Sequence, residues 1–360
     1  MGEGTDCWVG FDTSNYTTSV AVAVRDGNAP GGVSVVANLK TPLPVPPGGR
    51  GLRQSEAVFA HVRNLPGMTD ALGRVLSESG YRVAAVGYSA RPRDAADSYM
   101  PCFLEGAVAA RAFAAGCGVP VYAFSHQSGH IAAAMYGAGL LTGSGEDGLR
   151  FPEQPLLAFH VSGGTTEAVL VRPRPEGAEP AVSTADDGRA GGHTVQPLAG
   201  GFSVEIVGGS ADLHAGQVID RAGVMMGLSF PCGPALEALA ASNQSKLPPV
   251  KLSVRDGFCN LSGVENQAAR LWQETGDAPL VSAFVLTCVG RTLRRMTDQL
   301  QQKLAGPGEY LPVLYAGGVM SNRLIRPLLR EGAGWETHFA PPAYAADNAA
   351  GVALLCAGVQ

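Results

Sequence analysis

Two histidines lie four residues apart, His126 and His130, in the stretch SHQSGHIAA. Four residues are about one turn of an α-helix, so both imidazoles would project from the same face. Imidazole nitrogen is a common ligand of iron and zinc. The spacing therefore indicates a candidate metal site, although an ordinary helix face also has this pattern.

Hydrophobic periodicity and turn residues predict strands and helices in alternation around this pair. In the first half we expect a hairpin over 7–27 with a polar turn, strands over 83–90 and 119–125, and helices over 56–80, 103–118 and 126–141, the first interrupted by Pro66. Residues 142–154 are expected to be a loop and 174–203 an exposed insertion. The second half repeats the order, with a strand–glycine turn–strand over 155–173, helices over 213–228, 234–241 and 282–306, a strand–double glycine–helix over 310–332 and a closing helix over 345–358.

Three small or glycine-rich turns thus follow one another, two in hairpins and one between a strand and a helix. Backbone N–H groups in such turns can hold anions. The order resembles the two phosphate elements and the adenosine element of the sugar kinase/Hsp70/actin (ASKHA) fold. We therefore predict a two-lobed α/β fold with a nucleotide cleft between the lobes. The first lobe would comprise residues 1–142 and the closing helix 345–360, and the second residues 155–344.

The composition limits the partners. The formal net charge is −5, and the densest basic cluster is RTLRRM at 291–296, so no basic stripe is evident. A nucleic-acid binder acting alone normally has a basic face, which leaves a local patch or a partner protein as the route to RNA. Seven scattered cysteines without a CxxC pair argue against a disulfide framework, and neither a signal peptide nor a membrane span is expected. We expect a cytoplasmic protein.

Several motifs occur together and in order: HQSGHIAA, HVSGGTTE, GQVIDRAGVMMGLSFPCGPALEALA, FCNLSG, YAGGVMSNRLI and APPAYAADNAAGVA, with AHVRNLP in the first half. As a set they closely resemble the TsaD/Gcp family over nearly the whole chain. That family makes the threonylcarbamoyl modification on adenosine of tRNA and was once called O-sialoglycoprotein endopeptidase. The resemblance implies an acyltransferase that takes threonylcarbamoyl from its adenylate, works with companion proteins, and pairs in homo- or heterodimers through helices of the first lobe.

The resemblance also implies a ligand set for one divalent metal, Fe or Zn. The family's HxxxH pair and late aspartate match His126, His130 and Asp347. Some members add a tyrosine before the glycine turn, where this chain has His160. A strand residue there could supply a third imidazole, or it could be a half-buried histidine with a hydrogen bond.

For ATP or an acyl-adenylate, the family's binding positions carry over residue by residue. They are the second phosphate turn, a ribose aspartate, the adenosine contact region and the last glycine turn, which match Ser162, Gly163, Gly164, Asp220, Gly233, Glu237, Gly317, Gly318 and Asn322. Taken without the resemblance, the glycines would be ordinary turns and the two carboxylates solvated helix residues.

The chain departs from the family in the first-lobe turn. The family's usual E-T-S-C-D-E-T reads DTSNYTT here, so Asp12 and Ser14 keep the start and Tyr16 and Thr17 replace an acidic pair. Hydroxyls at these candidate catalytic positions cannot serve as a general base at neutral pH without activation. The family's G-P-G-L stretch is also replaced, by a longer segment containing Asp94 and Asp97, one of which could supply a carboxylate.

Three functions remain open at this point. The first is a metal-assisted carbamoyl-type transferase, which we expect to be a divergent paralogue and a poor threonylcarbamoyl transferase on tRNA. The second is a non-catalytic subunit that binds nucleotide and a partner. The third, a metallopeptidase, is disfavoured, because the HExxH pattern of such enzymes needs a glutamate where this chain has Gln127.

Overall fold

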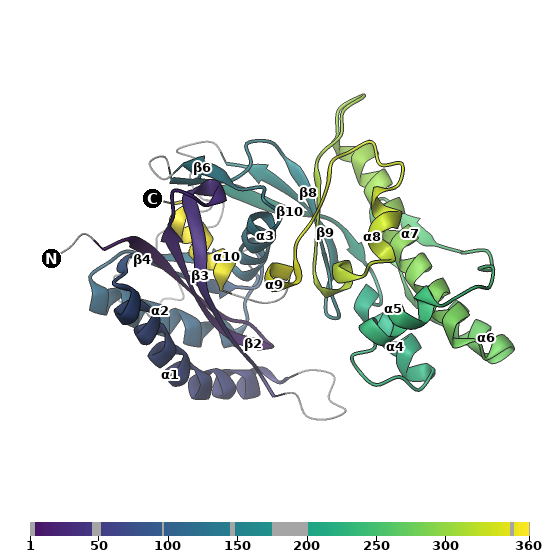
Figure 1. The fold of residues 1–360 in the computed structure, drawn as a ribbon, viewed down its shortest axis with the longest axis horizontal. Coiled ribbons are helices and arrows are strands. Elements are labelled where there is room, and N and C mark those ends of the chain that lie inside the picture. Colours follow the sequence, from purple (N-terminus) through teal and green to yellow (C-terminus); the bar gives the residue numbers. More distant parts are fainter. Residues whose placement is uncertain are drawn as a thin grey trace. The chain divides into compact units, whose positions relative to one another are not determined.

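A computed structural model describes residues 4–44, 52–95, 97–144, 148–174, 201–345 and 349–359. The chain divides into two compact units (Figure 1). Unit 1 comprises Met1–Gln154, Arg172–Val204 and Ala346–Gln360, and unit 2 comprises Pro155–Val171 and Glu205–Ala345. Each unit combines a β-sheet with α-helices, which agrees with the predicted two-lobed α/β fold.

Unit 1 is built on a five-stranded sheet in the order β3-β2-β1-β4-β5. The strands are β1 (Asp6–Thr13), β2 (Thr17–Arg25), β3 (Val33–Pro42), β4 (Arg82–Arg91) and β5 (Val121–Ser125). β1, β2 and β3 pair antiparallel, whereas β4 runs parallel to β1 and β5 parallel to β4. The first two strands are buried along almost their full length, because helices cover the sheet on both faces.

The helices α1 (Gln54–Ser79) and α2 (Leu104–Cys117) lie on one face of this sheet, and α3 (His126–Gly137) and α10 (Ala350–Ala357) lie on the other (Figure 1). The backbone of α10 approaches β1 so closely at Gly10 that a Cβ there would lie 2.5 Å from the Ala349 carbonyl oxygen. Glycine is therefore required at this contact between sheet and helix. The wholly apolar α10 is buried throughout, as its sequence predicts for a closing helix.

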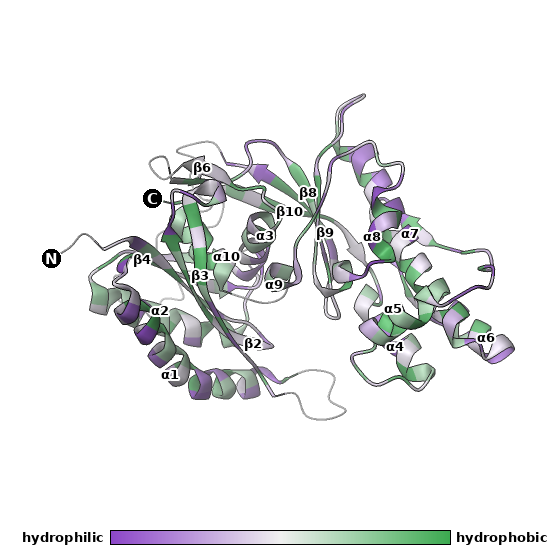
Figure 2. Cartoon of the chain, viewed as in Figure 1, coloured by the Kyte–Doolittle hydropathy of each residue, from purple (hydrophilic) through white to green (hydrophobic). Residues whose placement is uncertain are grey.

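Pro66 does not interrupt α1, so the predicted break is wrong. The helix runs without a break from Gln54 to Ser79, with hydrophilic and hydrophobic residues alternating along it (Figure 2). Proline lacks the N–H that would bond the carbonyl four residues earlier. That carbonyl belongs to Val62, whose exposure leaves it open to water. The buried face with Ala57, His61 and Leu72 holds the helix together across the proline.

Unit 2 contains strands of a seven-stranded sheet in the order β11-β12-β10-β9-β8-β13-β14. These strands are β8 (Leu156–Val161), β9 (Thr166–Pro173), β10 (Phe202–Ser210), β11 (Ser253–Arg255), β12 (Phe258–Asn260), β13 (Val313–Ala316) and β14 (Thr337–Phe339). The helices are α4 (Ala215–Met225), α5 (Gly233–Ala241), α6 (Ser262–Thr275), α7 (Ala278–Leu304), α8 (Ile325–Arg330) and α9 (Pro342–Ala345). The buried side of α7 and strands β8 and β13 form one hydrophobic core with α4 and α5.

The segment 142–154 is not only a loop as predicted, because β6 (Thr142–Ser144) and β7 (Gly148–Arg150) pair antiparallel. Three-residue strands are too short to produce a recognisable alternation in the sequence. Most of the predicted insertion, residues 175–200, lies outside the described residues. Short 3₁₀ turns occur at Pro30–Gly32, Pro101–Phe103 and Gly318–Ser321.

All seven cysteines are free, and all except Cys117 are buried, in agreement with the predicted absence of a disulfide framework. Among the described residues no helix is both long and apolar enough to span a membrane.

Candidate functional site

The turn between β1 and β2 contains three of the four candidate catalytic residues. The Ser14 N–H donates to the Thr17 carbonyl at 3.1 Å, and the Thr17 N–H donates to the Ser14 Oγ at 3.2 Å. These two bonds close a four-residue turn at Ser14–Thr17. The Ser14 hydroxyl is thereby used to shape the turn, whereas 46% of Tyr16 is exposed to solvent.

Asp12, the fourth candidate, is buried beneath this turn and contacts the histidine pair. Only 1% of Asp12 is exposed, and its Oδ1 lies 2.8 Å from the Nδ1 of His126. The Nε2 atoms of His126 and His130 lie 2.9 Å apart. The N-cap hydroxyl of Ser125, which accepts from the Ser128 N–H, starts α3 so that both imidazoles share the face directed at Asp12.

This chain of three side chains determines the proton positions on His126. Because a carboxylate only accepts hydrogen bonds, the Nδ1 of His126 carries the proton and donates to Asp12. The Nε2 lone pair of His126 then points at the Nε2 of His130. A carboxylate behind one nitrogen and a lone pair on the other is the usual arrangement of a metal-binding histidine. The 2.9 Å separation is also close to the ~3.3 Å between two nitrogen ligands of one tetrahedral zinc ion.

His61 was not among the predicted site residues, yet it holds the turn from below. It is fully buried, and its Nε2 lies 2.9 Å from the Ser14 carbonyl oxygen. Because that oxygen can only accept, Nε2 donates and Nδ1 accepts from the Thr18 hydroxyl at 2.8 Å. The Asn64 amide in turn donates to the Thr18 hydroxyl. Burial lowers the pKa of His61, which keeps the ring in this neutral form. The motif AHVRNLP was the signal that could have identified it.

Glu105, at the start of α2, is a second residue that the sequence did not single out. Its Oε2 atom is buried with no hydrogen-bond partner among the described residues, as is the Oδ2 of Asp12. Burial raises the pKa of Glu105 above its ordinary value. The next residue, Gly106, donates its N–H to the Thr13 hydroxyl at the beginning of the turn. A carboxylate of this kind near the turn is a candidate proton acceptor.

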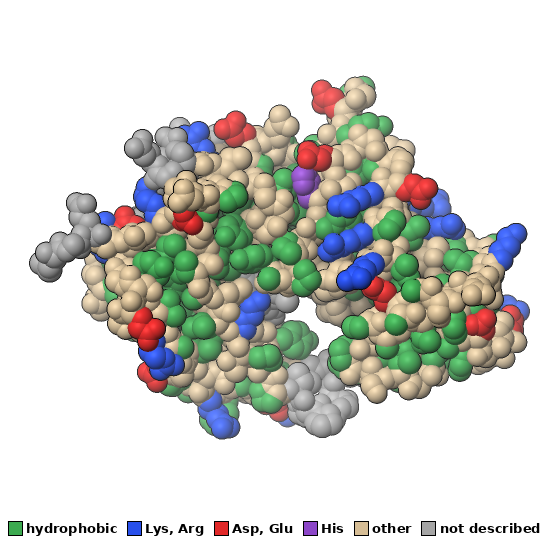
Figure 3. Space-filling model, viewed as in Figure 1, with side chains coloured by type: hydrophobic (Ala, Val, Ile, Leu, Met, Phe, Trp, Pro, Cys, Tyr) green, Lys and Arg blue, Asp and Glu red, His purple; other side chains and the backbone are tan. Residues whose placement is uncertain are grey.

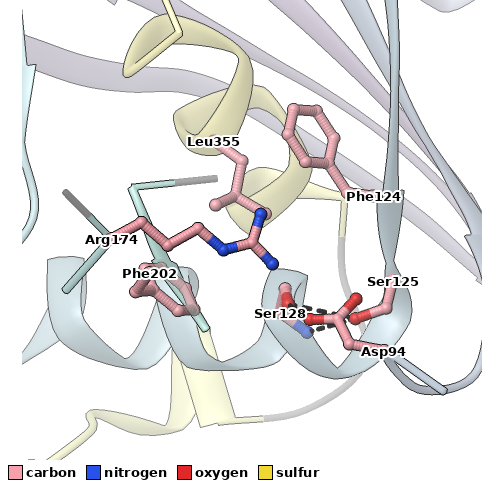
Figure 4. A pocket seen from close by; sticks show the side chains of 7 residues that line it. All are labelled: Asp94, Phe124, Ser125, Ser128, Arg174, Phe202 and Leu355. Atoms are coloured by element: carbon pink, nitrogen blue, oxygen red, sulfur yellow. Dashed lines mark hydrogen bonds between the residues drawn. The ribbon is translucent and has the colours of Figure 1, made fainter. Parts of the chain in front are cut away.

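Asp94, which could have replaced the missing acidic pair, is used elsewhere. Its Oδ2 accepts from the Ser128 hydroxyl at 2.8 Å in a small pocket of unit 1 (Figure 4). Ser128 lies two residues after His126, and side chains two apart do not share a helix face. The carboxylate of Asp94 therefore lies on a different side of α3 from the histidine pair. The pocket is lined by Asp94, Phe124, Ser125, Ser128, Arg174, Phe202 and Leu355.

In unit 2 the turn between β8 and β9 contains Ser162, Gly163 and Gly164. The Ser162 N–H donates to the Thr165 carbonyl at 2.7 Å, and the Ser162 hydroxyl accepts from the N–H groups of Gly164 and Thr165. Both glycines are exposed, and a Cβ at either would meet open space. The turn thus presents bare backbone to solvent, as a phosphate-binding turn requires.

Helix α4 supports this turn with its first backbone groups. The Ala215 N–H donates to the Thr166 hydroxyl at 2.9 Å, and the Gly216 N–H donates to the Ser162 carbonyl at 3.1 Å. A Cβ on Gly216 would lie 2.7 Å from the backbone of Gly163, so only glycine fits. Further along the same helix, the Oδ1 of Asp220 accepts from the Cys232 N–H at 2.8 Å and so fixes the residue before Gly233. Burial raises the pKa of Asp220.

The third turn follows β13. Gly317 has a φ of 100°, and a Cβ there would lie 2.2 Å from the Val161 carbonyl oxygen, whereas Gly318 faces open space. The Asn322 side chain accepts from the N–H groups of Leu324 and Ile325 and thereby starts α8. The Oε2 of Glu237 accepts from the N–H of Arg323, so α5 holds this turn in place.

The nine predicted nucleotide residues therefore all belong to unit 2, and Asp12, Ser14, Tyr16, Thr17, His126 and His130 belong to unit 1. His160, at the end of β8, belongs to unit 2, and Asp347 lies outside the described residues, so ligation by either stays a prediction. In the part of the chain that the structure describes, no three His, Cys, Asp or Glu side chains are grouped as a metal site.

Known proteins resemble this chain over its length. The model of the family TsaD, described as tRNA N6-adenosine threonylcarbamoyltransferase, matches residues 174–354, half of the chain. The protein of that name from Methanopyrus kandleri is 28% identical over 96% of this chain and 85% of its own length. The protein of that name from Thermus thermophilus is 29% identical over 96% of this chain and 91% of its own length.

A solved structure adds evidence on the fold. The crystal structure of T. kodakarensis HypF matches 95% of this chain and 45% of its own, with a TM-score of 0.50 and 14% identity. At this identity the likeness concerns the fold alone. Together with the family match it agrees with the predicted ASKHA fold.

Proposed function

This chain belongs to the TsaD family, tRNA N6-adenosine threonylcarbamoyltransferase, and from this premise we propose that it is a metal-dependent, adenine-nucleotide-binding transferase of carbamoyl-type groups. In this proposal it binds ATP or an acyl-adenylate in unit 2 and one Fe or Zn ion at His126 and His130 in unit 1. The donor resembling the family's is threonylcarbamoyl-AMP, and the acceptor is an amine such as N6 of adenosine in tRNA.

The observation that carries the proposal is the chain Asp12–His126–His130. His126 donates to Asp12 at 2.8 Å, and its second nitrogen lies 2.9 Å from His130. Two imidazole nitrogens that face each other at this distance need a proton or a cation between them. The residues therefore fit a divalent metal, with Asp347 and His160 as the predicted further ligands. When bound, this metal would polarise the carbonyl oxygen of the transferred group.

The residues of unit 2 would hold the adenylate. The exposed backbone of Gly163 offers an N–H group to phosphates, Gly164, whose N–H donates to the Ser162 hydroxyl, offers space beside it, and Gly318 offers the same space beside the last turn. Asp220 has one carboxylate oxygen bound to the Cys232 N–H, which orients the other toward a ribose hydroxyl in this proposal. Holding the donor in a fixed orientation is itself a large part of the catalysis of group transfer.

The residues of the first-lobe turn itself support slow transfer to tRNA, and the candidate proton acceptor near the turn, Glu105 on α2, is partly buried. Tyr16 and Thr17 bring no carboxylate, and Asp12 is buried against His126, so none of the three can accept a proton from an incoming amine at neutral pH. Losing a general base typically lowers a rate by about 10²–10⁴-fold. The alternatives are another acceptor on the same scaffold, or a subunit that binds nucleotide without transfer. A peptidase remains disfavoured, because Gln127 cannot accept a proton from metal-bound water.

Metal content is the first test. Purified protein should contain about one Fe or Zn ion per chain. His126→Ala should remove the ion, and Asp12→Asn should weaken its binding by about 10–100-fold, because a neutral amide orients the imidazole less firmly than a carboxylate and does not raise its basicity. His338→Ala, a substitution on β14 in unit 2, serves as the control. Unchanged metal content in His126→Ala would refute the site.

The second test separates the classes of function. Metal-loaded protein is incubated with ATP, with threonylcarbamoyl-AMP plus tRNA, and with a casein-type protein. Mass spectrometry should detect threonylcarbamoyladenosine far below the level that an active family member produces, and no cleaved protein. Wild-type modification levels in a strain lacking its own enzyme would show that the hydroxyl-rich turn suffices.

The predicted dimer also stays a prediction. It is supported by exposed apolar side chains on the unit 1 helices, among them Phe59 and Val62 on α1 and Val108 on α2. Light scattering of purified wild-type protein and of Val108→Glu would test it, since a charge in a dimer interface should yield monomers.

A further inference from the structure

Three arginines form a basic stripe on unit 2, where the sequence had suggested none. Arg326 and Arg330 lie four residues apart on α8, the spacing that places side chains on one side of a helix, and Arg323 lies in the turn just before this helix. Arg323 and Arg330 are exposed and Arg326 is half-buried. Figure 3 shows Lys and Arg side chains gathered in a row over the position of α8 in Figure 1. The sequence shows no continuous basic run here, because apolar residues separate the three arginines.

An aromatic stack supports the stripe. The guanidinium carbons of Arg326 and Arg330 lie 5.0 Å and 4.8 Å from the centre of the Phe339 ring. Phe339 stacks on Tyr315 at 5.4 Å, and Tyr315 stacks on Phe159 in the core. Tyr315 and Phe159 are fully buried, so the outer ring has a rigid base. Cation–π contacts of this kind hold the planar guanidinium groups in place and leave for a ligand the N–H groups of Arg330 and those of Arg326 other than its Nε, which donates to the Met320 carbonyl.

The positive charge of the stripe is only partly offset, by Glu237, whose carboxylate accepts from the Arg323 N–H. No Asp or Glu among the described residues forms an ion pair with the three guanidinium groups, whereas four other arginines of unit 2 each pair with an acid: Arg221, Arg255, Arg270 and Arg294. Burial, and then the charge of Arg330, lower the pKa of Arg326, and Glu237 opposes this. Like charges held together against their repulsion favour an anionic ligand that spans them.

We infer that Arg323, Arg326 and Arg330 form a binding surface for the phosphodiester backbone of RNA. The inference rests on the proposed function, since it gives the tRNA acceptor a docking surface that the net charge of −5 does not otherwise provide. The surface is expected to read charge and spacing rather than base sequence, because contacts of guanidinium groups with phosphates carry no sequence information.

RNA fits the stripe better than an acidic protein segment for a geometric reason. Arg326 and Arg330, four apart on α8, have Cβ atoms about 5–6 Å apart, which suits anions repeated regularly along a strand, and Arg323 extends the row from the turn before the helix. Guanidinium groups bind phosphate oxygens in a bidentate manner. The acidic side chains of a protein segment have no such fixed repeat. An acidic peptide is therefore the competing ligand that the experiment must exclude.

The experiment compares the double variant Arg323→Gln/Arg330→Gln with the matched variant Arg255→Gln/Arg270→Gln. All four residues are exposed in unit 2, and the control pair loses the same charge, but Arg255 and Arg270 are each paired with an acid. Arg326 is kept, because its Nε donates to the Met320 carbonyl and supports the fold. Binding of unmodified tRNA to the full chain is measured by fluorescence anisotropy from 50 to about 300 mM salt, with poly-glutamate as a competitor.

Each lost phosphate contact should reduce the steepness of log binding constant against log salt concentration by ~0.7–0.9. The slope of the double variant should therefore be shallower than that of the wild type by about 1–2, and its binding about tenfold weaker. The control should match the wild type. Equal slopes in both variants, no binding of tRNA to the wild type, or equally strong competition by poly-glutamate would each overturn the inference. Transfer is assayed separately: stripe-dependent binding without transfer refutes the proposed function alone, and transfer that ignores the stripe refutes the inference alone.

Discussion

The turns Ser14–Thr17 in unit 1 and Ser162–Thr165 in unit 2 have the same framework. In each, a serine N–H donates to the carbonyl of a threonine three residues later, and the threonine N–H returns to the serine hydroxyl. In each, the next residue is a threonine whose hydroxyl accepts from an N–H of a supporting helix, Thr18 from Asn64 and Thr166 from Ala215. The two hairpins differ in their central residues and in how the helix reaches them.

The supporting helices approach the two turns differently. In unit 2 the first backbone N–H groups of α4 contact the turn directly, and the Gly216 N–H donates to the Ser162 carbonyl. In unit 1 the side of the long helix α1 provides an imidazole and an amide, and the Ser14 carbonyl accepts from His61. A backbone donor leaves the unit 2 turn no room for a side chain beneath it. A side-chain donor makes the unit 1 turn dependent on the protonation state of one histidine, His61.

The centres of the turns follow this difference. Gly163 and Gly164 leave backbone open to an anion, whereas Asn15 and Tyr16 cover the unit 1 turn with side chains, and Asn15 is bound by Gln54. One framework thus serves two purposes: an open cradle in unit 2, and in unit 1 a braced loop above Asp12 and the histidine pair. Four predictions test this difference between the two turns.

We expect the largest effect from Gly216→Val. The new side chain would meet the backbone of Ser162 and Gly163 within 2.8 Å, so the turn must move. Overpacking against backbone costs about 3 kcal/mol of unfolding free energy, and we expect about 100-fold weaker binding of ATP. Urea unfolding and calorimetry measure the two. Gly263→Ala on α6, where a Cβ meets open space, is the control and should be neutral or slightly stabilising.

His61→Ala should be nearly as costly. It removes the donor to Ser14 and leaves the Thr18 hydroxyl without its acceptor in a buried site. Unsatisfied polar groups and the cavity together should cost about 2–3 kcal/mol of unfolding free energy. Because the lost hydrogen bonds lie in unit 1, metal affinity or the rate of transfer should fall while ATP binding stays unchanged. Weakened ATP binding equal to that of Gly216→Val would contradict the separation of the two turns.

The equivalent threonines give a smaller, matched comparison. Thr166→Val and Thr18→Val each remove one hydroxyl and keep the shape of the side chain. Thr18→Val should cost more, about 2 kcal/mol against about 1 kcal/mol for Thr166→Val, because Thr18 serves both His61 and Asn64. Unfolding in urea measures the loss of unfolding free energy in both variants. A larger loss for Thr166→Val would contradict the argument that Thr18 matters more because it serves two partners.

The smallest effect concerns pH. Burial lowers the pKa of His61, so below about pH 6.5 the unfolded chain binds a proton that the folded chain does not, and stability falls as pH falls. Above that value this contribution is fully present. His214, the residue before α4, has a pKa lowered by burial as well. Stability measured between pH 8 and pH 5 should decline less steeply in His61→Gln than in wild type. An unaltered slope would show that His61 is not neutral in the fold.

Much of this architecture is predictable from local patterns. The two hairpins, α2 with its glycine end, the buried α10 and the glycines of the two unit 2 turns follow from alternation, turn chemistry and helical spacing, which act over a few residues. Pro66 was misjudged because the buried face of α1 outweighs one missing hydrogen bond. The short strands β6 and β7 were missed because three residues carry no readable period.

The sequence by itself determined the two-lobed α/β fold, the family, the histidine pair and the positions of the three polar or glycine-rich turns, because each depends on residue types at short, regular spacing. Only the tertiary structure decided that Asp12 orients His126, that His61 holds Ser14, that Asp94 serves Ser128, and that three separated arginines share one aromatic support. These contacts join residues from different elements, and side-chain packing over such separations leaves no periodic trace in the chain. Hydrogen-bond partners and charge neighbours of this kind are set by where the sheet and helices bring their side chains together.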